Sequence, residues 1–237
     1  MAVSFGEQIH ALTGFDGDSA TASEIGENFD DVTAEWMNSA VREVINILPL
    51  KLKQKCATAT GVGTDFKVDL DGLGEVLYVT RENADSGFLV PCREIPSMYG
   101  GLAFEGSGHM MYEPSITDPV YWIDGDNSGA ATLYVKPTPT TNQPAIVHHV
   151  AYPVFDADGS GSNINIKTAT SIANFPDEVE YLVVLRAAIT AAEYQAAIEE
   201  DLELYIPIIQ NLKQDYLQGL QALGAVSQQP QQQKAQR

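Results

Sequence analysis

The sequence predicts an α+β protein in which a helical bundle carries an inserted antiparallel β-sandwich or barrel domain. Apolar residues recur at helical spacing over residues 31–48 and again after Phe175. Between these parts, residues 64–155 hold short segments rich in Val, Tyr and Phe that turn sequences separate. Because the helical parts flank the β-rich part, we expect an N-terminal helix and a C-terminal helix hairpin to form one bundle around the insertion point.

The chain has 237 residues, 44% of them hydrophobic, and is long enough to bury a core. We expect an N-terminal arm (1–30), a helical bundle (31–60 with 170–224), an inserted β-domain (61–169) and a disordered Gln-rich tail (225–237). No stretch approaches the ~20 apolar residues of a membrane span, and the N-terminus does not resemble a signal peptide. We therefore expect a soluble protein made and kept in a cytoplasm.

The N-terminal part is expected to contain a short helix and then a long one. Ser4 and Glu7 fit a capping box, and Gly14 would end the short helix. The acidic, glycine-containing stretch 14–31 predicts a loop or arm. The long helix is expected to begin at Asp31 or Thr33 and to run to Leu48, because Pro49 cannot continue it.

The β-domain is expected to contain five to seven antiparallel strands. The candidate segments are residues 65–70, 74–82, 87–95, 109–113, 119–124, 131–137 and 145–155. Sequences such as DGLG, ENADSG and TPTTNQP separate them, and these compositions are typical of turns. Short strands at this spacing predict a small sandwich or barrel.

Two more helices are expected after the β-domain. Pro176 suits a first helical position, and the next residues are acidic, as the positive end of a helix dipole favours. A run of alanines between Ala187 and Ala197 would let a neighbouring helix approach closely. The last helix spans Leu202 to Leu220 at a three–four spacing, and Pro207 should either kink it or mark its first turn.

The charge balance argues against a general nucleic-acid binder. The chain has 13 basic and 32 acidic residues, a net charge of −19, whereas such proteins neutralise phosphates with Lys and Arg. One short stretch, residues 34–60, is net positive. Its residues Lys51, Lys53 and Lys55 form either a solvated face or a contact with an acidic partner.

The sequence contains no recognised catalytic or nucleotide-binding motif. The Gly-Lys-Ser/Thr, Gly-x-Ser-x-Gly and His-Glu-x-x-His patterns do not occur. His148 and His149 are adjacent in an expected strand and so point to opposite faces. Cys56 and Cys92 are expected to be reduced and inert. We therefore expect no catalytic residue, no metal site and no cofactor.

Two acidic loops resemble the first half of a calcium-binding loop. Residues 124–129 and 156–161 place oxygen ligands at positions one, three and five and glycine at position six. A bidentate Glu belongs at position twelve, where the chain has Val135 and Lys167. We interpret both loops as turns between strands. Trp36 and Trp122 are interpreted as core residues.

The order of elements, with two sequence patterns, resembles the head-to-tail adaptor (connector) proteins of tailed bacteriophages. One pattern is the helix 32–48 with Trp36 and its ending Val-Ile-Asn-Ile-Leu-Pro49. The other is Phe175-Pro-Asp-Glu-Val-Glu-Tyr-Leu-Val-Val-Leu-Arg-Ala-Ala-Ile-Thr-Ala-Ala192. The layout is most similar to adaptors that carry a large β-insert, and head-closure or other neck proteins are the neighbouring alternatives.

The resemblance implies a structural virion protein of the neck, assembled in the host cytoplasm, and no enzyme. Such proteins form a ring, usually of twelve copies, between the portal protein and the downstream tail or nozzle protein. The ring extends the DNA channel without binding DNA specifically, and its C-terminal segment commonly inserts against the portal. Candidate partner contacts are therefore Lys51, Lys53, Lys55, Gln228, Gln229, Gln231, Gln232, Gln233, Lys234 and Arg237.

A second hypothesis comes from another class of protein. The β-domain would then be a β-sandwich module that binds carbohydrate or a host surface, and the helices would be its stalk. Tyr99, Tyr112, Tyr121 and Trp122 would supply an aromatic platform for the ligand.

Overall fold

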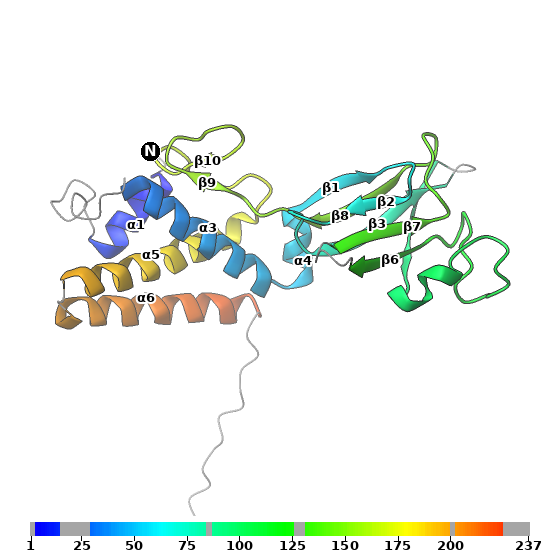
Figure 1. The fold of residues 1–237 in the computed structure, drawn as a ribbon. Helices are drawn as coiled ribbons and strands as arrows, with labels where there is room; N and C mark the ends of the chain where they lie inside the picture. Colours follow the sequence, from blue (N-terminus) through cyan, green and yellow to red (C-terminus); the bar gives the residue numbers. More distant parts are fainter. Residues whose placement is uncertain (1–2, 15–28, 84–86, 126–130, 200–201, 225–237) are drawn as a thin grey trace, which may run out of the picture. The chain divides into compact units, whose positions relative to one another are not determined.

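A computed structural model of the protein describes residues 3–14, 29–83, 87–125, 131–199 and 202–224 (Figure 1). It confirms the predicted α+β class. The chain separates into two compact units, Met1–Cys56 with Tyr152–Arg237 and Ala57–Ala151, which we call the helical unit and the β-unit. None of the described helices combines the length and the apolar character that crossing a membrane requires.

The helical unit is built around one central helix. Its helices in the described residues are α1 (Phe5–Thr13), α3 (Phe29–Ile47), the short α4 (Leu50–Lys53), α5 (Asp177–Glu199) and α6 (Leu202–Ala222). Helix α5 packs against α1, α3 and α6, which explains why apolar residues cover it on all sides. Its buried alanines include Ala187, Ala188, Ala191 and Ala192. The predicted helix hairpin is confirmed, and α1 and α3 cover the rest of the central helix.

The ends of the helices follow from local sequence. The Ser4 hydroxyl accepts a hydrogen bond from the backbone of Glu7, and the Glu7 carboxylate accepts one from the backbone of Ser4, which is the predicted capping box. Gly14 ends α1 in the left-handed conformation at φ 71°. Pro207 lies inside α6 and not in its first turn, because the helix already begins at Leu202.

A short β-ribbon returns the chain from the β-unit to the helices. Strands β9 (Phe155–Asp156) and β10 (Ile164–Asn165) pair in parallel. The side-chain amide of Asn38 on α3 donates to the Phe155 carbonyl at 2.9 Å, and its oxygen accepts from the Phe155 amide at 2.7 Å. This double hydrogen bond fastens β9 to α3, so residues 152–169 belong to the helical unit and not, as expected, to the β-domain.

The β-unit is a sandwich of two four-stranded sheets (Figure 1). One sheet has the order β1 (Ala57–Val62), β8 (Ala145–Val150), β3 (Val76–Glu82), β4 (Leu89–Pro91). The other has the order β2 (Lys67–Asp69), β7 (Ala131–Lys136), β6 (Val120–Gly125), β5 (Arg93–Glu94). Buried residues of both sheets, including Val79, Val147, Leu133 and Val135, form one core. The described strands form a sandwich and not a closed barrel.

Three expectations for the β-unit were wrong in detail. Residues 57–60, assigned to the helical bundle, begin strand β1, which pairs with β8. Residues 109–113 form turns and not a strand, because Gly106 and Gly108 on their N-terminal side adopt positive φ and Met110 is 97% exposed. The sheets are also not purely antiparallel, since β5 pairs in parallel with β6.

Candidate interaction site

The three lysines lie on one short helical segment, α4 followed by the 3-10 turn Gln54–Cys56. Helical geometry turns residues two positions apart to different sides, so the lysines do not share one face. Lys55 Nζ lies 2.6 Å from Glu178 Oε1 at the start of α5, and this hydrogen bond lowers the pKa of Glu178. Lys55 is therefore engaged within the chain, whereas Lys51 is exposed.

The candidate contacts in the tail are not placed by the structure. Gln228, Gln229, Gln231, Gln232, Gln233, Lys234 and Arg237 lie outside the described residues. The last described segment is α6, which ends at Ala222 and is followed by Leu223 and Gly224.

The four aromatic residues of the carbohydrate hypothesis do not form one platform. Tyr121 and Trp122 are buried on opposite faces of β6, and the Tyr121 hydroxyl donates to Glu94 at 3.1 Å. Trp122 stacks on Tyr134, and its indole edge lies against the 3-10 turn η2 (Ser97–Leu102). Tyr99 and Tyr112 stack on each other at 4.4 Å between ring centroids. Tyr99 and Tyr112 are half-buried, and each uses one ring face for this stack.

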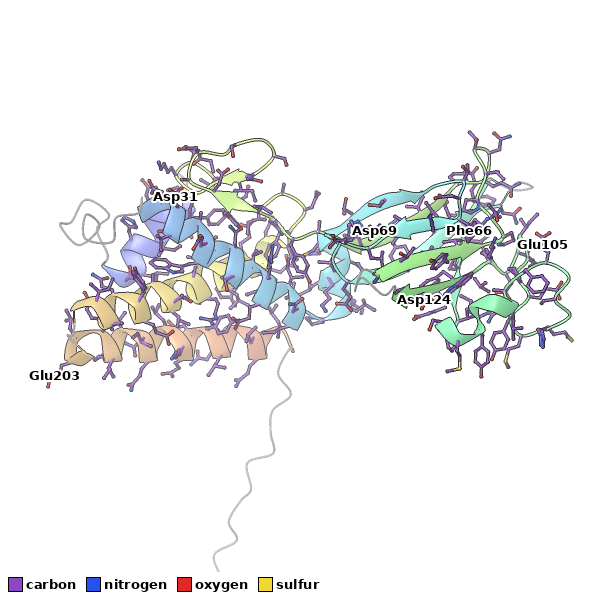
Figure 2. The ribbon with its side chains drawn as sticks, in the orientation of Figure 1. Asp31, Phe66, Asp69, Glu105, Asp124 and Glu203 are labelled. Carbon is purple, nitrogen blue, oxygen red and sulfur yellow. The ribbon has the colours of Figure 1, made fainter. Side chains whose placement is uncertain are left out.

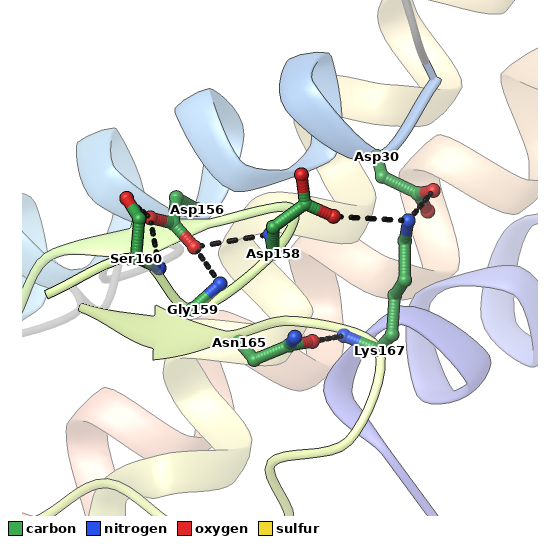
Figure 3. Close-up of polar contacts among 7 residues, drawn as sticks. All are labelled: Asp30, Asp156, Asp158, Gly159, Ser160, Asn165 and Lys167. Atoms are coloured by element: carbon green, nitrogen blue, oxygen red, sulfur yellow. Dashed lines mark hydrogen bonds and ion pairs between the residues drawn. The ribbon is translucent and has the colours of Figure 1, made fainter.

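The acidic loop 156–161 is a hydrogen-bonded turn (Figure 3). The Asp156 carboxylate accepts hydrogen bonds from the backbones of Asp158, Gly159 and Ser160, from the Ser160 hydroxyl and from the Asn163 amide. These donors, led by the Ser160 hydroxyl, lower the pKa of Asp156 to about 2. The carboxylate therefore organises its own loop.

The second acidic loop is only partly placed. Asp124 lies in β6 opposite Thr132 of β7, and residues 126–130 lie outside the described residues. Across the part of the chain that the structure describes, no group of three or more His, Cys, Asp or Glu side chains is arranged to hold a metal ion.

The histidines and cysteines have structural partners. His149 is buried with Nε2 3.0 Å from Thr60 Oγ1, and His148 stacks on Tyr78 with ring centroids 4.3 Å apart. Cys56 and Cys92 are free and buried. Burial raises the pKa of Cys56 to about 11 and that of Cys92 to about 12, so both thiols stay protonated at neutral pH.

Arg81 was not among the residues predicted from the sequence, although it is buried and lines a cavity of the β-unit. Arg81 lies on β3 and is 2% exposed, and its Nη2 donates to the Thr138 carbonyl and to Gln143 Oε1. Its Nε and Nη1 are buried without a hydrogen-bond partner. The sequence feature that could have identified Arg81 is the strand period of two, which places it on the same face as the core residue Val79. Burial lowers the pKa of Arg81, whereas the nearby side chains of Cys92 and Glu105 raise it.

Arg81 borders a cavity of about 440 Å³. Lys136, Thr138 and Gln143 provide further polar lining. Phe104 and Ile116, from the loop after η2, provide apolar lining and are themselves exposed. Figure 2 labels Glu105, which also lines the cavity, at the end of the β-unit that carries this loop. We call this cavity the Arg81 pocket.

The helical unit also exposes large apolar side chains. Ile206 and Leu217 on α6 are 44% and 51% exposed, and their spacing of eleven residues places them on the same side of the helix. Leu204 on α6 and Tyr181 on α5 are exposed as well. Each of these four side chains leaves a large part of its surface exposed in the described helical unit.

One family match covers all of the described fold except helix α1 and Gly14 with the residues before them. A family model described as SU10 adaptor protein matches residues 17–237, which include most of the helical unit and the entire β-unit. No curated protein matches the chain significantly. The match supports the resemblance to phage adaptors that the sequence analysis drew from residues 32–49 and 175–192. The chain therefore belongs to the SU10 adaptor protein family.

Proposed function

We propose that this protein is a structural component of the virion. Twelve copies, the usual number for such adaptors, would form a ring between the portal and the tail of a tailed phage. The observation that carries the proposal is the family match over residues 17–237. The proposal assigns the chain to adaptors with a large β-insert, represented here by the β-unit. It assigns a structural and not a catalytic role, with assembly in the host cytoplasm and a place in the neck.

The exposed apolar side chains of the helical unit support contacts between subunits. Ile206 and Leu217 share one side of α6, with Lys213 between them paired to Glu193 at 2.7 Å. Closed rings are built from repeated contacts between two different patches of neighbouring subunits, and such patches need apolar area. In this proposal the α6 side carrying Ile206 and Leu217 belongs to one such patch.

The net charge supports a channel through which DNA passes without being held. A charge of −19 per subunit repels phosphate, so the ring would extend the channel without binding the duplex specifically. The same charge makes free subunits repel each other, more strongly at low salt. We therefore infer that the free protein is largely monomeric and that the portal acts as the template for the ring.

The C-terminal tail is the proposed contact with the portal. Residues 225–237 include six glutamines and end in the basic residues Lys234 and Arg237. A polar segment of this composition cannot bury a core of its own and can order on a partner. Lys51, which is exposed, is a second proposed contact, and the opposite surface of the ring would receive the tail or nozzle protein.

The experiment that tests the tail contact compares the full chain with a variant ending at residue 224 for binding to purified portal protein. A third variant carries residues 225–237 in shuffled order, which preserves length and charge. We expect both variants to melt at the temperature of the full chain and to bind the portal at least about tenfold more weakly, a loss of about 1.4 kcal/mol. Unchanged binding of the truncated chain would remove the tail from the proposal.

A further inference from the structure

Arg81 is a buried cation that forms no direct ion pair among the described residues, although Glu105 lines the same cavity and its charge raises the pKa of Arg81. Its exposed fraction is 2%, and two of its three guanidinium nitrogens have no hydrogen-bond partner. Among the ion pairs formed by the described residues, none includes Arg81. A buried charge is strongly unfavourable unless a partner of opposite charge compensates it. Because Glu105 is not hydrogen-bonded to Arg81 in the described structure, Nε and Nη1 remain available for an anion that binds the guanidinium directly.

A second cation lies at the same cavity. Lys136 lines the Arg81 pocket, donates to the Thr138 hydroxyl at 3.0 Å and lies 3.7 Å from the centroid of the Phe66 ring. Like Arg81, it forms none of the ion pairs among the described residues. These contacts hold the ammonium group in place without neutralising it.

The two cations stand out against the composition of the β-unit. Residues 57–151 contain 12 acidic residues and only four basic ones, namely Lys67, Arg81, Arg93 and Lys136. Arg93 is paired with Asp118 at 2.9 Å, and Lys67 is exposed on β2. Half of the basic residues of an acidic unit thus border one cavity, which concentrates positive potential there.

The rim of the pocket identifies the source of the anion. Phe104 and Ile116 line the pocket and are 52% and 39% exposed, and Met110 and Met111 of the same loop are more exposed still. An apolar rim around a charged base is typical of a protein interface, where aromatic and Met residues are enriched. Nucleic acid would instead need a basic stripe along the surface. The cavity of about 440 Å³ falls within the range of small-ligand sites and accommodates an acidic side chain with an apolar neighbour.

We propose that the Arg81 pocket is a binding site for a carboxylate of a partner protein, presented by an acidic segment that also carries an apolar side chain. The carboxylate supplies a directly bonded counter-charge to Arg81 and Lys136, and the apolar side chain packs on Phe104 and Ile116. Glu105, an exposed carboxylate at the same cavity, opposes entry of a second carboxylate. The site does not require ring formation, so its test is independent of the adaptor proposal.

The test is an NMR titration of the ¹⁵N-labelled full chain with three probes. These are N-acetyl-Glu-Leu-amide, its neutral counterpart N-acetyl-Gln-Leu-amide, and inorganic phosphate. We expect the Arg81 Nε–H signal and the amide signals of Phe104 and Thr138 to shift in a saturable manner with the acidic peptide alone. Equal shifts with the neutral peptide, tighter binding of phosphate, or no shift at Arg81 would each overturn the proposal.

Three substitutions should change the affinity for the acidic peptide in different directions. Lys136→Gln should weaken binding of the acidic peptide about tenfold, because it removes one charge-assisted contact. Glu105→Gln should strengthen binding about threefold, because it removes a like charge from the cavity. Lys67→Gln removes the same charge from exposed strand β2 and should change binding little. Equal effects of Lys67→Gln and Lys136→Gln would mean that only overall charge matters, and would overturn the site.

Discussion

At the scale of single residues, one carboxylate decides the structure of the loop after β9. Asp156 accepts its hydrogen bonds from donors of the loop itself. Asp158, two residues later, has a side chain that is 87% exposed and lies 3.8 Å from Lys167 (Figure 3). The two aspartates occupy positions one and three of the same calcium-loop pattern, yet only Asp156 organises the turn. The contrast provides a matched pair of substitutions.

Asp156→Asn should lower the melting temperature at pH 7. The pKa of Asp156 falls from an ordinary 3.8 to about 2 in the folded protein, so its stabilisation is present above about pH 4 and is lost as the pH falls towards 2. The difference in melting temperature between wild type and Asp156→Asn should therefore narrow over this range, as thermal denaturation at several pH values would measure. Asp158→Asn should melt like the wild type. A difference that is constant from pH 7 to pH 2 would contradict this assignment.

A second residue-scale prediction concerns the glycine pair in η2. A Cβ added to Gly100 would lie 2.6 Å from the Trp122 indole, which is buried and stacked on Tyr134, whereas one added to Gly101 would meet nothing within 4 Å. Gly100→Ala should cost about 1–3 kcal/mol of unfolding free energy through overpacking. Gly101→Ala should change it by about 0.5 kcal/mol or less. Chemical denaturation measures both, and equal costs would show that Trp122 moves aside.

At the scale of elements, the attachment of β9 to α3 depends on one side chain. Asn38 makes two hydrogen bonds to the backbone of Phe155, and Asn46, on the same helix, accepts one from the exposed Tyr152 hydroxyl. Asn38→Ala should lower the free energy of unfolding by about 1–3 kcal/mol, because the half-buried carbonyl and amide of Phe155 lose their hydrogen-bond partner. Asn46→Ala should lower the free energy of unfolding by about 0.5 kcal/mol or less. Denaturation of the two variants checks this order, and the reverse order would contradict it.

The sequence predicted the helices better than the strands. The helices α3, α5 and α6 carry apolar periodicity, acidic first turns or caps, which are local signals. Strand β1 has the sequence ATATGV, in which small residues hide the alternation, and it becomes a strand through pairing with β8. Residues 109–113 have strand-like composition but lie among glycines with positive φ. A partner strand far along the chain decided the first case, and the conformation of the preceding glycines Gly106 and Gly108 decided the second.

In the candidate site, too, the sequence predicted local patterns but not contacts between distant segments. The lysines of α4 were visible in the sequence as a charge pattern, but the partner of Lys55, Glu178, lies 123 positions away. The Arg81 pocket combines β3, the loop after η2, and the segment from Lys136 to Gln143. No local pattern brings these three segments together, because the sheet topology does so. The strand period of two could have placed Arg81 on the core face beside Val79, but it gives no information on the pocket.

At the scale of the whole molecule, the β-unit is inserted into a chain whose helices hold each other. Helix α5 takes its packing from α1, α3 and α6, all within the helical unit. Replacing residues 57–151 with a short Gly/Ser linker should therefore leave a helical protein that melts cooperatively. Circular dichroism with thermal melting provides the measurement. Loss of helicity would show that the helices depend on the β-unit.

The proposed function depends on assembly of the protein into a ring on the portal. Native mass spectrometry of the full-length chain, alone and mixed with purified portal protein, tests it most directly. We expect the chain alone to be largely monomeric, because subunits with a charge of −19 repel each other. With the portal present, we expect about twelve copies bound to one portal assembly. A stable homodimer or trimer that ignores the portal would contradict the adaptor ring and favour a binding module.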